Sequence, residues 1–157
     1  MLGLVAALAI ALPAQAQNAG QIGRARAGAS CPGCNLFQAD FNGLSMRARN
    51  FSGARLRQAD LSLTVMNRTT FAGADLRDVE AYGGVFTSSD FSGANLTNAS
   101  FVGTYLQAAN FRGAILEGAN FSGAEMDRAT GLTQAQLNRA CGDRATTLPP
   151  GLRIRPC

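Results

Sequence analysis

Large apolar residues return at every fifth position through the middle of the chain, from Leu36 to Met126. Eighteen of these nineteen central positions hold Leu, Phe or Met, and only Ala81 departs from the pattern. A small residue, most often alanine, recurs two positions before each centre. A period of five fits neither a helix, with about 3.6 residues per turn, nor a flat strand, with about two. It indicates a chain that turns a corner every five residues and points the centre inward each time.

The same positions also repeat at a spacing of twenty, as leucine does at Leu36, Leu56, Leu76, Leu96 and Leu116. Four sides of five residues close one square coil, and like residues then stack on like along the axis. We number the faces from the centre Leu36. The first centres of the second, third and fourth faces are then Phe41, Met46 and Phe51. Glycine stands two positions after the centres of the second and fourth faces, and only Leu63 breaks this rule. Because corners with positive φ favour glycine, the sequence predicts two glycine corners and two ordinary corners per coil.

A motif of alanine, aspartate or asparagine, then leucine or phenylalanine recurs, as at Ala39-Asp40-Phe41, Ala74-Asp75-Leu76 and Ala119-Asn120-Phe121. In this motif the chain resembles the pentapeptide-repeat family over about 60% of its length. The resemblance implies an all-β solenoid, a right-handed quadrilateral β-helix of about five coils, roughly 23 Å long at the ~4.8 Å strand spacing. The departures from the pattern are Leu44, Arg49 and Val79 in the small-residue position and Ala81 at a centre.

Residues 1–16 are typical of a secretory signal peptide. The apolar run from Leu2 to Leu12 is followed by Pro13 and by a small-residue cleavage pattern that ends at Ala16. The run is too short to cross a bilayer, which needs about 20 residues. We therefore predict a periplasmic or secreted protein with no integral membrane span after cleavage. The run departs from the signal pattern in one respect, since no basic residue precedes it. An uncleaved anchor and a buried core helix are the alternatives.

The segments that flank the repeats complete the domain organisation. Residues 17–30 lack apolar periodicity and are predicted to be a flexible linker, or else a tether whose two arginines touch an anionic surface. The β-helix is assigned to 31–130. In 131–157, Thr133 and Gln136 form a capping box. A short capping helix should run to about Cys141 and stop at Gly142, before a tail tied by a disulfide.

Cys31 and Cys34 precede the first coil, and Cys141 and Cys157 follow the last. An even count in an exported chain indicates disulfides. The two pairs lie at opposite ends of a solenoid about 23 Å long, whereas bonded cysteines need Cα atoms within ~7 Å. The predicted pairs are therefore 31–34 and 141–157, and one shared four-cysteine zinc site is excluded. For Cys31 and Cys34, a terminal disulfide or a buried thiol pair is favoured over a redox centre, which would need a βαβ context.

Composition argues against catalysis. The chain has 157 residues, a net charge of +4 and no histidine, so the common nucleophile–base pairs are missing. Most carboxylates stand just before a centre, where they are expected to form corner hydrogen bonds rather than catalytic pairs. We predict no enzymatic activity, no cofactor and no metal site. The alternative function is a redox-active envelope protein that uses Cys31 and Cys34.

Charge bears on the possible partners. Some pentapeptide-repeat proteins resemble duplex DNA and act on DNA gyrase, a role that requires an acidic surface, whereas this chain is basic. Direct binding of nucleic acid is not expected either, because aromatic residues are not interleaved with the arginines. Arg55, Arg57 and Arg77 form a candidate basic patch for an anionic envelope surface or an acidic partner. The alternative is a solvated face that keeps the protein soluble.

Apolar residues also occupy outward positions on three successive coils. Val65, Val85 and Tyr105 precede the centres of the third face, and the adjoining corner carries Leu63, Tyr82 and Val102. These six residues should form one exposed stripe that binds an unknown protein partner or forms a homodimer. Side chains that lie flat, or an ordinary patch of ~300–600 Å², are the alternatives. The sequence therefore predicts a non-catalytic, exported structural or protein-interaction module.

Overall fold

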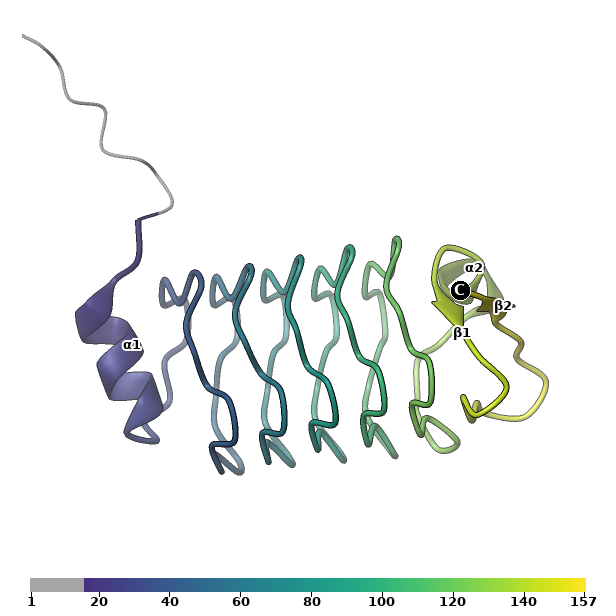
Figure 1. Cartoon of the computed structure of the whole chain (residues 1–157), viewed down its shortest axis with the longest axis horizontal. Coiled ribbons are helices and arrows are strands. Elements are labelled where there is room, and N and C mark those ends of the chain that lie inside the picture. The colour runs from purple at the N-terminus through teal and green to yellow at the C-terminus, as the bar shows by residue number, and fades with distance from the viewer. Residues whose placement is uncertain (1–15) are drawn as a thin grey trace, which may run out of the picture.

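The computed structural model describes residues 16–157, so nearly all of the predicted signal peptide lies outside the described residues. The chain winds into a stack of four-sided β coils (Figure 1). Sixteen of the eighteen isolated β-bridges between described residues join positions twenty apart, all of them parallel. Each coil therefore has four sides of five residues, as the spacing predicted. Each side contributes one bridging residue, the outward residue just before the centre, as in the bridge between Asp40 and Asp60.

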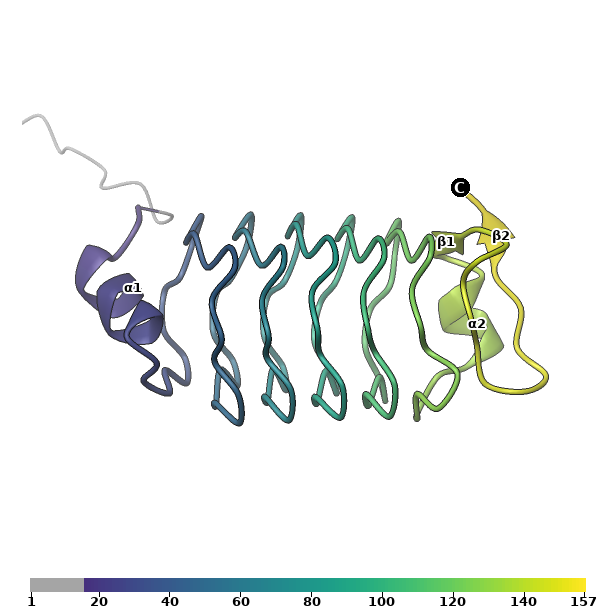
Figure 2. The ribbon, with the colours of Figure 1, turned by 60° about the horizontal axis from the view of Figure 1, so that its bottom comes forward.

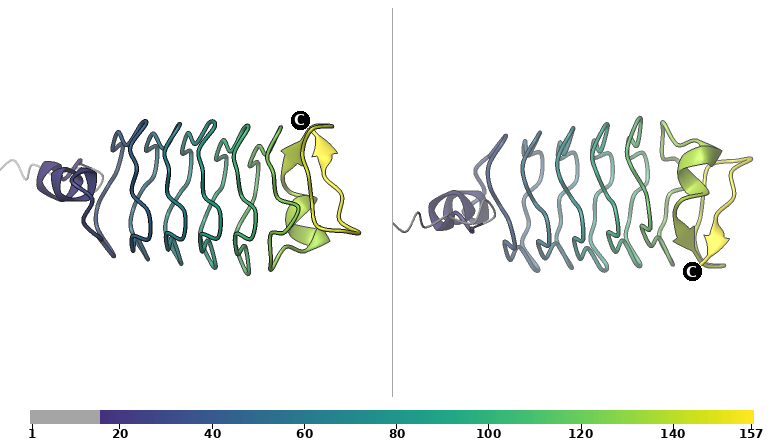
Figure 3. Two further views of the ribbon diagram at one scale, coloured as in Figure 1. Left: turned by 90° about the horizontal axis from the view of Figure 1, so that it is seen from below. Right: turned by 90° about the horizontal axis from the view of Figure 1, so that it is seen from above.

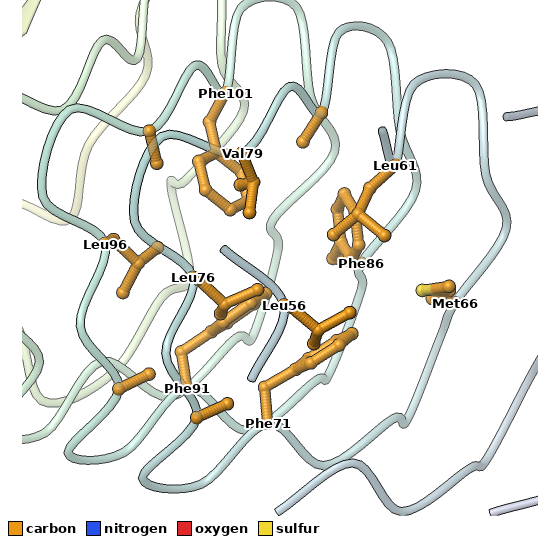
Figure 4. Packing of buried hydrophobic residues seen from close by; sticks show 14 of the residues in the cluster. Leu56, Leu61, Met66, Phe71, Leu76, Val79, Phe86, Phe91, Leu96 and Phe101 are labelled. Carbon is orange, nitrogen blue, oxygen red and sulfur yellow. The ribbon is translucent and has the colours of Figure 1, made fainter. Parts of the chain in front are cut away.

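The core is a column of buried centres along the axis of the coils (Figure 4). On the fourth face, the rings of Phe71 and Phe91 stack with centroids 5.1 Å apart, and those of Phe91 and Phe111 with centroids 5.3 Å apart. The pattern is broken at Val79, which is larger than the usual small residue, and at Ala81, which is smaller than the usual centre. Both side chains are still buried, so the large and small departures occur together in one unit of the repeat. In the first coil, by contrast, Arg49 is exposed.

The corner prediction is wrong in one respect. The residue two positions after the centre has positive φ after all four faces, not only where glycine stands. The N–H of Leu44 donates to the carbonyl of Phe41 at 3.0 Å, closing a four-residue turn. Positive φ at the third residue of such a turn is the mark of type II geometry. At the corners from Gln38 to Gly123 this position has positive φ throughout, so nine non-glycine residues of the described chain also adopt it: Gln38, Ala48, Gln58, Leu63, Arg68, Asp78, Ser88, Asn98 and Ala108.

The aspartate or asparagine of the repeat motif braces the corner that follows it. The side chain of Asp40 accepts a hydrogen bond from the N–H of Asn42 at 2.9 Å. Asn95 accepts in the same way from the N–H of Thr97, at 3.0 Å. This Asx bond satisfies the second N–H of the turn, which explains why the motif prefers these two residue types just before the centre.

The prediction of a flexible linker at 17–30 is also wrong. Helix α1, Ala19–Arg26, is capped by the side chain of Asn18, which accepts from the N–H of Gln21. Its residue Ala25 is fully buried in the core cluster. The side chain of Gln21 accepts from the N–H of Asn35 at 2.6 Å. This tertiary contact with the first coil helps to hold in place a short helix whose intrinsic propensity is lowered by Gly20 and Gly23.

At the other end, helix α2 spans Gln134–Leu137 (Figure 2). It has the predicted capping box between Thr133 and Gln136. It is shorter than predicted, and Gly142 is not its stop. Instead, Cys141 and Gly142 form strand β1, Cys141–Gly142, which pairs in parallel with β2, Arg155–Pro156. Cys141 leaves the helical path because it continues the second-face ladder: its N–H donates to Ala119 and its carbonyl accepts from Phe121. Figure 3 shows α1 and the α2–β1–β2 group at opposite ends of the coils.

Candidate protein-interaction site

The six residues of the predicted stripe lie together on the surface. Val65 bridges Val85, and Val85 bridges Tyr105, so the third-face residues stack on successive coils. At the adjoining corner, the N–H of Leu63 donates to the carbonyl of Tyr82 at 2.8 Å. The backbone of Val102 continues this column, because its carbonyl accepts from the N–H of Gly83 at 3.0 Å. We call Leu63, Val65, Tyr82, Val85, Val102 and Tyr105 the apolar stripe.

Much of the apolar stripe is open to solvent. Leu63 and Tyr82 are each 56% exposed and Tyr105 is 44% exposed, whereas the three valines are half-buried. Between the two columns, the hydroxyls of Thr64 and Thr104 are buried and donate to backbone carbonyls. Polar groups beneath the stripe are thus internally satisfied, and the outer surface is left to apolar side chains.

The predicted basic patch is largely neutralised. The guanidinium of Arg77 donates to Asp75 at 2.6 and 2.7 Å, and that of Arg57 lies 3.4 Å from a carboxylate oxygen of Asp78. The hydrogen bond from Arg77 lowers the pKa of Asp75, against the opposing effect of partial burial. Arg55 lies against the same group of side chains. The patch is therefore a mixed-charge network, which matches the alternative of a solvated face.

The four cysteines form the two predicted disulfides, one at each end of the solenoid. Cys31 and Cys34 have Cα atoms 5.4 Å apart, and Cys141 and Cys157 have Cα atoms 4.8 Å apart. Cys31 and Cys34 are only 4% and 8% exposed. Since thiol exchange requires access to the sulfur, this burial favours a structural role over the redox alternative. Among residues 16–157, no cluster of three or more His, Cys, Asp or Glu side chains is placed to hold a metal ion.

One feature was missed by the sequence reasoning: a cavity of about 280 Å³ at the corner after the third face. It lies beside the apolar stripe, because the third face leads directly into this corner. We call it the corner pocket, and it is lined by Arg47, Ala48, Asn67, Arg68, Thr87 and Ser88. The available signal was the lack of aspartate or asparagine before the third-face centres, which was interpreted only as an apolar pattern.

Comparison with known proteins agrees with the architecture. A family model described as pentapeptide repeats matches eight copies, over residues 50–80, 89–128 and 104–141. No curated protein sequence matches the chain. Within the part of the chain that is described, no helix has the length and apolarity to span a membrane.

Several solved structures are similar to this chain. One is HetL, a pentapeptide repeat protein involved in heterocyst differentiation regulation from the cyanobacterium Nostoc sp. strain PCC 7120. It is 25% identical with a TM-score of 0.57, over 76% of this chain and 51% of HetL. The chain thus spans about half the length of HetL. A thylakoid-lumen pentapeptide repeat protein from Arabidopsis thaliana is 26% identical with a TM-score of 0.39, over 60% of this chain and 72% of the other.

Proposed function

Because this chain belongs to the pentapeptide-repeat family, we propose that it is a non-catalytic interaction module of the cell envelope. It binds a protein partner, or a second copy of itself, through the apolar stripe. Members of the family fold as right-handed quadrilateral β-helices and are generally non-enzymatic. The observation that carries the proposal is the exposure of Leu63, Tyr82 and Tyr105 on one side of the solenoid. Tyrosine is enriched in protein interfaces, since it buries a large area and keeps a polar tip.

The ends of the solenoid support a lateral interface. In the proposed arrangement of about five coils, α1 covers the first coil, and α2 with the disulfide-tied tail covers the last. The side chain of Gln136 donates to the carbonyls of Phe111 and Ala114, both at 2.9 Å. Covered ends leave few unpaired backbone groups for end-to-end pairing. The side of the solenoid is then the surface left for a partner.

Export to the periplasm or beyond is part of the proposal. It is supported by the apolar run and the cleavage pattern within residues 1–16. It is also supported by two disulfides, which persist mainly in oxidising compartments. Expression in a bacterial host should give a mature protein that begins at Gln17, as determined by intact-mass measurement of the envelope fraction. A full-length product in the cytoplasm would contradict export and leave the interaction proposal to its own test.

The interface is tested by Val85→Asp combined with Tyr105→Arg, followed by light scattering and a pull-down from envelope extract. Because both side chains point outward, the double variant should stay folded and lose self-association or its bound partner. The matched control is Ile115→Asp, which charges a 50% exposed apolar residue on the first face, outside the stripe. If the double variant behaves like this control in both assays, the stripe is not an interface.

A further inference from the structure

The corner after the third face lacks the Asx brace found elsewhere in the solenoid. On the other faces, the brace is repeated, as between Asp90 and the N–H of Ser92, at 2.9 Å. On the third face the equivalent outward residues are Ser45, Val65, Val85, Tyr105 and Glu125. Within residues 16–157, the N–H groups of Arg47, Asn67 and Thr87 accordingly have no hydrogen-bond acceptor. Three backbone donors therefore face outward, one above the other, at this corner.

The side chains around these donors add positive charge and further hydrogen-bonding capacity. Arg47 and Arg68 line the corner pocket and form no ion pair with a carboxylate of residues 16–157. Both are exposed, unlike Arg57 and Arg77, which are held by acidic neighbours. In the described chain, the Oδ1 atom of Asn67 is buried without a hydrogen-bond partner. The corner pocket thus combines two arginines that form no ion pair in the described chain with an amide oxygen that has no partner there.

We propose that the corner pocket binds the carboxylate of an acidic segment in the partner protein, while apolar residues of that segment lie on the apolar stripe. This inference rests on the proposed function and specifies the chemistry of the partner. At many corners of the other faces, a side-chain oxygen of the chain's own Asp or Asn occupies the equivalent place, as Asp40 does for Asn42. A carboxylate from outside would accept from the backbone donors and from the guanidinium of Arg47 or Arg68, in a charge-assisted bond.

A polypeptide fits this pocket better than a free anion does. The side-chain amide of Asn67 can present either its Nδ2 donor or, after a rotation, its Oδ1 acceptor, and a peptide supplies both a carboxylate acceptor and a backbone N–H donor. A fully ionised inorganic anion offers acceptors alone. The neighbouring stripe extends the same surface with Val65 and Val85, which adjoin the pocket along the third face. A segment with adjacent acidic and apolar side chains matches both parts.

The test uses the full mature chain and a fluorescently labelled peptide in which leucine and aspartate alternate. Binding is followed by fluorescence polarisation and compared with a peptide that carries asparagine in place of aspartate. We expect the acidic peptide to bind at least about tenfold more tightly, and Arg47→Gln with Arg68→Gln to abolish that preference. The control, Arg112→Gln with Arg153→Gln, changes the net charge equally at two arginines outside the pocket and should leave the preference intact.

Several results would overturn the inference. Equal affinity for the two peptides, no binding at millimolar concentration, or equal losses in both arginine variants would each do so. Displacement by inorganic phosphate at matching concentration would indicate a general anion site instead. Leu63→Ser with Tyr82→Ser separates the two proposals, because both residues lie outside the pocket. Suppose that the two peptides bind equally well and that this variant weakens their binding. The proposal that the stripe is an interface is then supported, and the inference about the pocket is overturned.

Discussion

At the scale of single residues, the corners carry conformational strain. Among residues 16–157, nine non-glycine residues are held at positive φ, a conformation that costs an L-residue roughly 1–2 kcal/mol. The strain persists because the turn is fixed by closure of the coil and not by the residue at its third position. The side chain at that position is therefore free to vary, at a local cost in stability.

Ala108→Gly should stabilise the protein. Ala108 has φ +58° and is exposed, so the substitution relieves strain without removing buried surface. After the greater unfolded-state entropy of glycine is subtracted, we expect a gain of about 0.5–1 kcal/mol in unfolding free energy. The measurement is a urea titration. Ala72→Gly is the control, since Ala72 lies one position earlier in its corner and is not among the residues with positive φ. Destabilisation by both substitutions would contradict the argument.

Acid should weaken the corner braces. Partial burial raises the pKa of Asp60, but hydrogen bonds from the hydroxyl and N–H of Ser62 and from Asn42 outweigh this effect and lower it overall. A carboxyl group whose pKa is lower in the folded state contributes stability above its ordinary pKa of about 3.8. That contribution is lost as the pH falls below this value and through the folded pKa.

The consequence is measurable by thermal unfolding between neutral and strongly acidic pH. Asp60→Asn keeps an acceptor for the N–H of Ser62 but cannot titrate, so the variant should lose less stability in acid than the parent protein. Asp40 and Glu80 bridge Asp60 on either side and share its sign of charge. Relief of this repulsion would raise the variant's stability at neutral pH too. The informative quantity is therefore the slope of melting temperature against pH in the acidic range. An unchanged slope would rule out a contribution from Asp60.

At the scale of elements, the faces were predictable and the termini less so. The spacing of five places each centre inside the coil independently of the residues around it. Phe91 and Leu96 could therefore be assigned to the core from the sequence. Helix α1 was missed because Gly20 and Gly23 lower its intrinsic helix propensity. Burial of Ala25 against the first coil compensates for this. The end of α2 was misplaced because Cys141 joins the ladder of Asn120, a long-range pairing that local signals do not report.

The C-terminal disulfide should supply much of the stability of the tail. It closes a loop with a sequence separation of 16, and the two strands it joins have two residues each. Loop-closure entropy then predicts a loss of about 3 kcal/mol for Cys141→Ser with Cys157→Ser. Hydrogen exchange should show the loss first at the N–H of Cys157, which donates to Gly142. A change below about 1 kcal/mol in denaturant unfolding would mean that β1 and β2 hold the tail without the bond.

At the scale of the whole molecule, the candidate site was only partly predictable. The period of twenty stacks Val65, Val85 and Tyr105, so the apolar stripe follows from counting positions. The basic patch was overestimated because the corner turns bring Asp75 and Asp78 onto its arginines. The corner pocket could not be found by searching for a motif. Its only signal in the sequence is a missing residue type, aspartate or asparagine before the third-face centres. The meaning of that signal became clear only when the hydrogen bonds of the braced corners were known.

A solenoid transmits stability only between neighbouring coils, so the position of a core substitution should decide how far its effect spreads. Phe91 is fully buried and stacks on Phe71 and Phe111. It also packs edge-on against Phe86 and Phe101, with centroids 5.9 and 5.8 Å away. Phe91→Ala therefore removes contacts to three successive coils and should cost about 3–5 kcal/mol.

Met46→Ala is the matched substitution near the N-terminal end, where Met46 is 2% exposed. We expect it to lower hydrogen-exchange protection mainly in the first coils, because fewer neighbours depend on that centre. Phe91→Ala should instead lower protection on both sides of its own coil and broaden the denaturant transition as the two halves begin to unfold separately. Identical protection patterns for the two variants would show that the coils unfold as one unit. A near-neutral Phe91→Ala would contradict the stacked column itself, since no neighbouring centre can fill the space of a phenyl ring without moving a coil.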